Sequence, residues 1–276
     1  MKDYFSYNGG EGILPKDSFR ISPSQLSRFF DQTSQWYSEY LLGNKPEFQG
    51  NTATYLGTCI HAAAEMYTNE NKIHYDQIDS YINSIKDYEV DKYTIREQYP
   101  IMIETLITEY LAKQNDSSPL TELFVYHEIL PGIFPSGSVD RYSKKLGGCI
   151  TDYKSMGSLD SARVPTSFPR AYYFQQLTYA YLMRKQGYKV STCELVYISR
   201  ANTGRYSEKT GKRMKDYPSQ VNTLTYDIKD DDMEFIESIL LLIAESVQAW
   251  NKHPELRHII SQDYRNKIKT YPKFIK

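Results

Sequence analysis

Cysteine is scarce in this chain of 276 residues. Only Cys59, Cys149 and Cys193 occur, far apart and without CxxC spacing. An odd number of isolated cysteines argues against a disulfide framework, a zinc site or an iron–sulfur cluster, and it is typical of proteins from reducing compartments. We therefore expect the fold to be held by an ordinary hydrophobic core, for which the chain is long enough.

Long apolar runs and excess charge are also missing. No apolar run reaches about 18 residues, so we expect no membrane span. The polar start MKDYFSYNGGEG does not resemble a signal peptide. The net charge is −1, with 40% hydrophobic and 24% charged residues. Any contact with nucleic acid must therefore come from a local basic patch.

Periodicity predicts a mixture of helices and strands. Capping residues and apolar spacing indicate helices over 22–42, 55–69, 75–90, 94–113, 170–186 and 230–250. Alternating or buried apolar runs indicate strands over 123–130, 133–142, 146–154, 190–199 and 221–228. This order predicts an α/β (α+β) fold, in which a central sheet is flanked by helices and preceded by a helical elaboration.

One predicted hairpin, SVDRYSKKLGGCITDYKS, carries a concentration of charge. If its turn is centred near Leu146, Asp140 lies directly opposite Asp152, and Lys154 shares a face with Asp152. Two opposed carboxylates are destabilising unless a cation joins them, and oxygen ligands of this kind suit Mg²⁺ or Mn²⁺. The alternative interpretation is a solvent-facing polar strand with a surface ion pair.

Two predicted helices and a loop supply further candidates. His61 and Glu65, and likewise Gln175 and Tyr179, are spaced i, i+4 and so share a helical face. The loop between the last two strands is basic, which fits either a solvated loop or a flap that contacts phosphates. Its cations are Arg205, Lys209, Lys212, Arg213 and Lys215.

Five segments together resemble the PD-(D/E)xK nucleases, within them the RecB-type group, in the order of that family. They are the opening helix ISPSQLSRFF, the histidine helix GTCIHAAAE, the strands GSVDRY and ITDYKS, and the helix FQQLTYAYLMRKQG. Each motif is weak alone, but the ordered set spans about residues 21–199. The resemblance implies a restriction-endonuclease-like mixed sheet.

The resemblance also implies roles for individual residues. His61, Asp140 and Asp152 would be metal ligands, joined by the backbone carbonyl of Tyr153. Lys154 would position or deprotonate the attacking water, while Gln175 and Tyr179 would line the site and touch the DNA backbone. Taken alone, His61 also fits a structural histidine in the core.

Two further acids, Glu65 and Glu128, are candidates for supporting the metal ligands, although Glu65 also fits a solvated carboxylate. Many members of the RecB-type group ligate an iron–sulfur cluster through a cysteine of the opening helix and three more near the C-terminus. Here FFDQTSQWY lacks the cysteine and none follows Cys193. We therefore expect no cluster, and one or two Mg²⁺ or Mn²⁺ ions instead.

The predicted activity is that of a stand-alone, metal-dependent exonuclease acting on DNA ends in recombination, repair or replication, of a kind encoded by phages and mobile elements. A structure-specific or nicking endonuclease with the same site, and a non-catalytic DNA-binding protein of the same fold, are the alternatives. We expect DNA ends or single strands as the partner, a single-strand annealing or binding protein as a candidate second partner, and a location in bacterial or phage-infected cytoplasm.

One nuclease domain is expected over residues 1–276. Its parts are an N-terminal arm (1–20), a helical part with the histidine motif (21–115), the catalytic sheet with its helices (120–252) and a basic tail (253–276).

Overall fold

A mixed six-stranded sheet forms the centre of the protein. The computed structural model describes residues 2–6, 10, 12–44, 50–157, 165–202, 204, 206, 210–213 and 215–253. The strand order is β1 (Phe19–Ile21), β3 (Ile133–Ser143), β4 (Cys149–Met156), β5 (Thr192–Ser199) and β6 (Val221–Asp227), and β2 (Leu120–Tyr126) also pairs with β3. The β1–β3 and β4–β5 pairs are parallel and the others antiparallel. The predicted fold class is confirmed.

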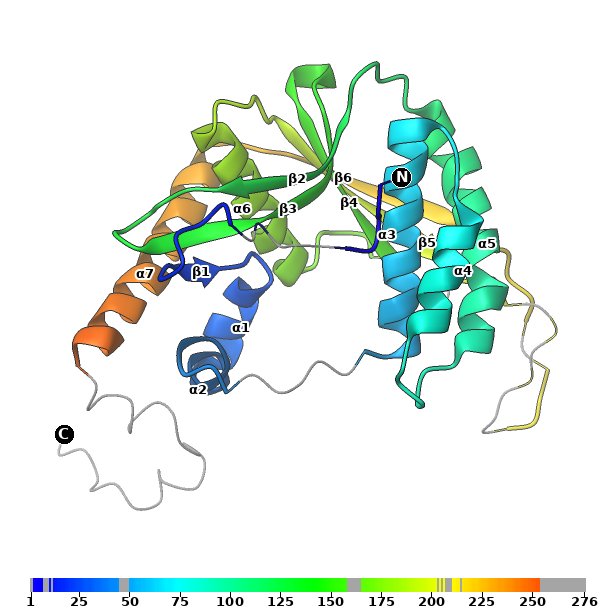
Figure 1. The fold of residues 1–276 in the computed structure, drawn as a ribbon. Coiled ribbons are helices and arrows are strands. Elements are labelled where there is room, and N and C mark those ends of the chain that lie inside the picture. The colour runs from blue at the N-terminus through cyan, green and yellow to red at the C-terminus, as the bar shows by residue number, and fades with distance from the viewer. Residues whose placement is uncertain are drawn as a thin grey trace.

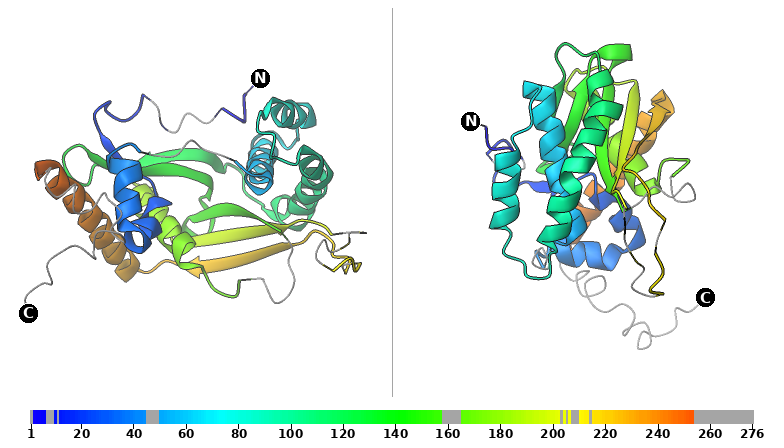
Figure 2. Two further views of the ribbon diagram at one scale, coloured as in Figure 1. Left: turned by 90° about the horizontal axis from the view of Figure 1, so that it is seen from below. Right: turned by 90° about the vertical axis from the view of Figure 1, so that its right-hand side faces the viewer.

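Helices pack on both faces of the sheet (Figures 1 and 2). One group, α3 (Thr52–Glu70), α4 (Tyr75–Ser84) and α5 (Lys92–Glu109), shares a buried cluster with Tyr153 of β4 and with Val196 and Ile198 of β5. Strand side chains alternate between faces. Ile150 of β4 lies three positions before Tyr153 and so points to the other face, where it packs into a second cluster with the helices of the opposite layer.

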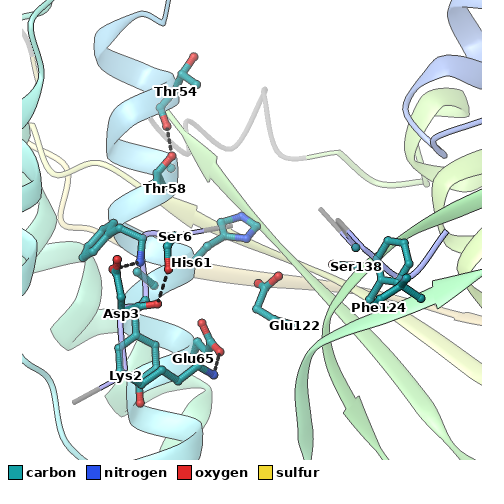
Figure 3. A pocket seen from close by; sticks show the side chains of 16 residues that line it. Lys2, Asp3, Ser6, Thr54, Thr58, His61, Glu65, Glu122, Phe124 and Ser138 are labelled. Atoms are coloured by element: carbon teal, nitrogen blue, oxygen red, sulfur yellow. Dashed lines mark hydrogen bonds and ion pairs between the residues drawn. The ribbon is translucent and has the colours of Figure 1, made fainter. Parts of the chain in front are cut away.

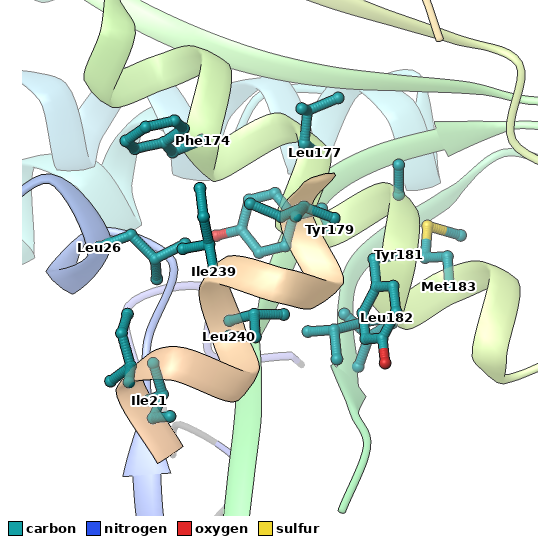
Figure 4. Close-up of a cluster of buried hydrophobic side chains, with 14 of the residues drawn as sticks. Ile21, Leu26, Phe174, Leu177, Tyr179, Tyr181, Leu182, Met183, Ile239 and Leu240 are labelled. Carbon is teal, nitrogen blue, oxygen red and sulfur yellow. The ribbon is translucent and has the colours of Figure 1, made fainter. Parts of the chain in front are cut away.

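The second layer contains α1 (Gln25–Asp31), α2 (Thr33–Trp36), α6 (Arg170–Lys185) and α7 (Asp230–Lys252). Figure 4 shows its core, where side chains of α6 meet α7, α1 and β1. Leu177, Leu182 and Leu240 are completely buried there. This packing fixes α6, and with it the polar side chains that α6 presents to the sheet.

The expected helix over 22–42 is shorter and interrupted. Gln32 has φ −146° and ψ 55°, so the α1 helix ends there, and a π-helical turn over Tyr37–Leu41 follows α2. Ser24 makes no side-chain cap, and its hydroxyl instead lies 3.2 Å from that of Ser22. The interruption lets the buried Trp36 pack edge-on against Phe29.

Other boundaries shift by a few residues. The strand expected over 123–130 runs over Leu120–Tyr126, because the chain turns at Pro131 and Gly132, and Leu130 already bridges to Ile133. The helix expected over 75–90 ends at Ser84, where Ile85 adopts an extended backbone. In the described part of the chain, no helix combines the length and apolarity that a membrane span needs.

Candidate active site

Three neighbouring strands place three acids in one row across the sheet. Strands β3 and β4 pair Arg141 with Thr151, so the next positions in that register are Asp140 and Asp152. This is the register that a turn centred near Leu146 predicts, and it is confirmed. The hydrogen-bonded pairing stops before the two acids. The Tyr153 backbone N–H donates to Asp140 Oδ2 at 2.9 Å instead.

Glu122 of β2 is the third member of the row. The β2–β3 register pairs Thr121 with Arg141 and Leu123 with Val139, which sets Glu122 against Asp140. The ladder skips this pair, and Glu122 has a left-handed backbone with φ 47°, which is uncommon outside glycine. Residues held in such sparsely populated backbone conformations cluster at active sites and ligand-binding sites.

Sequence reasoning missed Glu122, although the signal was present. Its position and that of Asp140 are equally far from the Pro131–Gly132 turn, just as Asp140 and Asp152 are from Leu146. The misplaced start of the predicted strand at residue 123 left Glu122 outside it. Extending the strand to Leu120 would have found this third acid by the same counting.

Helix α3 adds His61 to the row from above the sheet. The Asn51 side chain caps this helix by accepting from the Thr54 N–H at 2.9 Å. Three turns later, His61 Nδ1 lies 3.1 Å from Asp140 Oδ2, and the His61 ring meets Tyr153 edge-on at 6.1 Å. His61 therefore contacts Asp140, one of the two hairpin acids, and its role as a metal ligand stays a prediction.

Helix α6 closes the other side of the site. Gln175 Nε2 donates to Asp152 Oδ1 at 3.2 Å, and Lys154 Nζ lies 2.6 Å from Asp152 Oδ2 and donates to Gln175 Oε1 at 3.4 Å. Gln175 Nε2 also lies 3.5 Å from the Tyr179 hydroxyl. The i, i+4 pair on α6 and the strand pair on β4 thus form one hydrogen-bonded chain, as their spacing indicates.

Gly137 lies inside β3, three residues before Asp140, where the strand passes close to α6. A Cβ at this position would lie 2.9 Å from the Tyr179 ring and 3.1 Å from Pro23. Strand β3 can therefore approach α6 closely only where it lacks a side chain. This approach brings Tyr179 and Asp140 to the same cavity, of about 280 Å³, which Gln175 and His61 also line.

The ionisable side chains of the row have strongly perturbed pKa values. Burial and the Asp140 charge raise the pKa of Glu122 to about 8. Burial also raises the pKa of Asp152 to about 6, although Lys154 acts in the opposite direction. Burial lowers the pKa of His61, but Asp140 outweighs it and raises that pKa to about 9. Closely packed carboxylates with raised pKa values are typical of sites that bind a cation or a proton.

Lys154 is held in its charged form by its neighbours. Burial lowers the pKa of Lys154, but the charges of Asp152 and Asp140 outweigh it and raise the pKa. The Lys154 ammonium also lies 4.7 Å from the centroid of the Tyr172 ring, a cation–π contact that favours the charged form. With the charges of the protein alone, Lys154 is therefore in its charged ammonium form.

The donor set fits a divalent cation. Ligand atoms of His61, Glu122 and Asp140 all lie within 4.8 Å of one another. Two carboxylates and an imidazole match the ligands that Mn²⁺ accepts, and the carboxylates also suit Mg²⁺. Both oxygens of Asp152 contact Lys154 or Gln175. Asp152 and the Tyr153 carbonyl stay predicted ligands.

The two other acidic candidates lie in different surroundings. Glu65 is buried one helical turn after His61 and forms an ion pair with Lys2. Glu128 is exposed beyond the end of β2, where its carboxylate accepts from the Gly132 N–H at 2.8 Å. That contact gives Glu128 a role in the turn between β2 and β3, and a role beside the metal ligands stays a prediction.

The described residues of the basic loop between β5 and β6 line neither cavity at the site. Lys212, Arg213 and Lys215 are exposed, and Arg213 forms an ion pair with Asp216 at 2.8 Å. Arg205, Lys209 and the tail after His253 lie outside the described residues. Contact of this loop with DNA stays a prediction.

Comparison with known proteins decides the family. The sequence profile of the PD-(D/E)XK nuclease superfamily matches residues 20–253, most of the chain. The protein belongs to the PD-(D/E)XK nuclease superfamily. PD-(D/E)XK nucleases use divalent metals, which agrees with the acidic row. Among curated proteins, no sequence gives a significant match.

Solved structures of two other proteins align with this chain at low sequence identity. A candidate exonuclease from Eubacterium rectale aligns with TM-score 0.54 and 16% identity over 94% of this chain and 91% of that protein. The alkaline exonuclease LHK-Exo from Laribacter hongkongensis aligns with TM-score 0.42 and 10% identity over 92% of this chain and 96% of that one. The first likeness supports the PD-(D/E)XK fold.

Proposed function

We propose that this PD-(D/E)XK protein is a metal-dependent DNA exonuclease that hydrolyses phosphodiester bonds from DNA ends, with Mg²⁺ or Mn²⁺ as its cofactor. The observation that carries this proposal is the intact constellation, in which His61, Glu122 and Asp140 converge beside the chain of Asp152, Lys154 and Gln175. A non-catalytic relative would be free to lose such costly buried charges.

The side chains have distinct tasks in this proposal. A divalent cation, when bound, supplies acidity to the attacking water and a counter-charge to the phosphate. Asp140, held by the Tyr153 N–H and His61, keeps its carboxylate directed into the row. Gln175 and Lys154 fix both oxygens of Asp152, and the Lys154 ammonium offers a positive charge to the phosphate or the nucleophile.

Digestion of end-labelled linear DNA tests the activity. We expect cleavage with Mg²⁺ or Mn²⁺ that EDTA abolishes, and loss of cleavage in Asp152→Asn and in Lys154→Ala. Lys144→Ala is the matched control for the lysine, because Lys144 is exposed in the turn of the same hairpin. Full activity of the Lys154→Ala protein would contradict the assignment of this site.

Covalently closed circular duplex DNA separates the two modes of cleavage. An exonuclease leaves the circle intact and degrades it after linearisation. Nicking or linearisation of the circle, abolished by the same substitutions, would identify an endonuclease that uses this site.

A further inference from the structure

The two flanks of the acidic row differ in how fully their polar groups are paired. On the α3 side lies a larger cavity of about 580 Å³, which shares His61, Glu122 and Ser138 with the cavity of about 280 Å³. Figure 3 shows several polar groups around the larger cavity bonded to one another, such as Lys2 with Glu65. The polar groups buried under α6 are less completely paired.

Tyr197 of β5 is the first of these groups, and it lies beside Lys154. The parallel register of β4 and β5 pairs the two residues, on strands about 4.8 Å apart. Val196 and Ile198 belong to the cluster with α3, so Tyr197 points to the α6 face of the sheet. Lys154 points to the same face, where it contacts Gln175. The Tyr197 hydroxyl is buried, and no group in the described part of the chain forms a hydrogen bond with it.

Gln176 of α6 is the second group. Its side chain is completely buried, and neither its Oε1 nor its Nε2 has a partner among the described residues. Tyr172 precedes Gln176 by four residues, so the two share a face of the helix. Tyr172 contacts the Lys154 ammonium, which turns this face towards β4. Unpaired buried polar groups are costly and rare, so both Gln176 and Tyr197 call for a physical explanation.

Lys154 has one strong partner, and that partner is a predicted metal ligand. The ammonium lies 2.6 Å from Asp152 Oδ2, donates to Gln175 Oε1 at 3.4 Å and lies 4.7 Å from the centroid of the Tyr172 ring. A divalent cation beside Asp152 competes for the same oxygen and repels the ammonium. The Lys154 side chain is only 19% exposed, so water cannot fully replace the lost contact.

We propose that Tyr197 is a positioning residue for Lys154: its hydroxyl accepts a hydrogen bond from the ammonium when a divalent cation engages Asp152. The Gln176 amide oxygen is the second acceptor. The inference rests on the proposed function, in which Asp152 is a metal ligand, and adds the residues that keep the lysine in place. Strand β5 lies on the side of β4 opposite β3, which carries Asp140. Repulsion from a cation at the acidic row therefore drives the ammonium towards Tyr197.

The chemistry of Tyr197 suits this role. Burial raises the pKa of its hydroxyl to about 12, and Tyr172 and the Asp152 charge act in the same direction. The hydroxyl is therefore a neutral group at neutral pH, with lone pairs that can accept from an ammonium. Tyr172 influences Tyr197 and also contacts Lys154, which agrees with the neighbourhood that the strand register gives.

Stability without metal and affinity for Mn²⁺ should change in opposite directions. In EDTA, Tyr197→Phe removes a hydroxyl that has no protein partner, so we expect a Tm a few degrees higher in thermal unfolding. In a calorimetric titration the same variant should bind Mn²⁺ about tenfold more weakly, because the displaced ammonium loses a hydrogen bond to a buried acceptor. Gln176→Met should shift both quantities in the same directions.

Two controls and a double-mutant cycle separate this role from a packing effect. Ser136→Ala removes a buried hydroxyl of β3, and Gln98→Met removes a buried amide oxygen of α5, both also unpaired among the described residues. Neither variant should change the affinity for Mn²⁺. In a Lys154→Met background, Tyr197→Phe should no longer weaken Mn²⁺ binding, because the hydroxyl acts through the ammonium.

Unchanged Mn²⁺ binding in Tyr197→Phe, or weaker binding that persists in the Lys154→Met background, would overturn the proposal. A lower Tm of Tyr197→Phe in EDTA would also overturn it, because the hydroxyl would then already have a partner such as a structural water molecule. Cleavage of end-labelled DNA is measured separately. If the native protein shows the coupling but does not cut DNA, the nuclease function fails and the placement of Lys154 stands. Cleavage without the coupling rejects the role of Tyr197 alone.

Discussion

Replacing Glu122 by glutamine should stabilise the metal-free protein and weaken its binding of Mn²⁺. The carboxylate lies against Asp140 in the β2–β3 register, on a left-handed backbone. Glutamine keeps the shape of the side chain and removes its charge. The substitution therefore separates the electrostatic cost of the acidic row from its use as a ligand set.

The magnitude follows from the raised pKa. Glu122 has a pKa of about 8 against an ordinary 4.5. At 1.36 kcal/mol per pH unit, its charge would cost up to about 5 kcal/mol above pH 8. Because solvent screens that charge, we expect a gain of roughly 1–3 kcal/mol in the free energy of unfolding. For a chain of this size the gain corresponds to a rise of roughly 3–10 °C in Tm.

The sign of the pH dependence is fixed by the same shift. The folded protein binds the Glu122 proton more tightly than the unfolded chain, so the penalty is absent below the unfolded pKa near 4.5 and grows until pH reaches about 8. Thermal unfolding in EDTA should therefore show the gain of Glu122→Gln at pH 8.5 and a smaller gain at pH 5.5. Added Mn²⁺ should raise the Tm of the native protein more than that of the variant.

Glu128→Gln is the matched control, since Glu128 is exposed in the adjoining turn. It should change neither the Tm at pH 8.5 nor the response to Mn²⁺. A Glu122→Gln protein that is less stable than the native one in EDTA at pH 8.5, or that responds fully to Mn²⁺, would refute the electrostatic reasoning.

Three further predictions concern the packing of β3 against α6, the N-terminus of α7 and the metal dependence of cleavage. Gly137→Ala should lower the free energy of unfolding by about 1–3 kcal/mol and reduce activity, because its methyl group would meet the Tyr179 ring. Gly157→Ala is the control, since a methyl group there meets nothing within 4 Å. Urea unfolding compares the two variants. Asp232→Asn should cost about 1–2 kcal/mol at pH 7, because Asp232 accepts from the Lys229 N–H and from two tyrosine hydroxyls. Burial raises the pKa of Asp232, but these hydrogen bonds outweigh it and lower the pKa. The stabilisation is therefore present above the unfolded pKa near 3.8 and is lost as the pH falls. The difference in the free energy of unfolding between the native protein and Asp232→Asn should shrink below about pH 4. Removing metal with EDTA should stop DNA cleavage reversibly, with recovery on addition of Mn²⁺ in the end-labelling assay.

Local patterns predicted much of the site because its parts are short-range. The period of two along β4 and the symmetric turn set Asp140 against Asp152, and the helical spacing set Gln175 beside Tyr179. These relations depend on a few residues of contiguous chain. The same counting missed Glu122 only because the first residues of β2 were assigned to a loop.

Long-range contacts were beyond such reasoning. The ion pair of Lys2 with Glu65 joins residues 63 positions apart, and the contact of Gly10 with Phe124 joins a segment with no regular periodicity to a strand. Nothing in the N-terminal sequence indicates which surface it covers. The pairing of His61 with Asp140 was reached through the family resemblance, because spacing along the chain does not connect α3 with β3.

The sequence by itself determined the row of hairpin acids, the lysine two residues after Asp152 and the helical face that lines them, since backbone periodicity and turn symmetry dictate these neighbours. Only the tertiary structure decided that His61 lies against Asp140, that both oxygens of Asp152 are already engaged, and that Lys2–Ser6 line the cavity beside His61. These features arise where separate elements pack together, and packing is set by the whole core and not by any one stretch of chain.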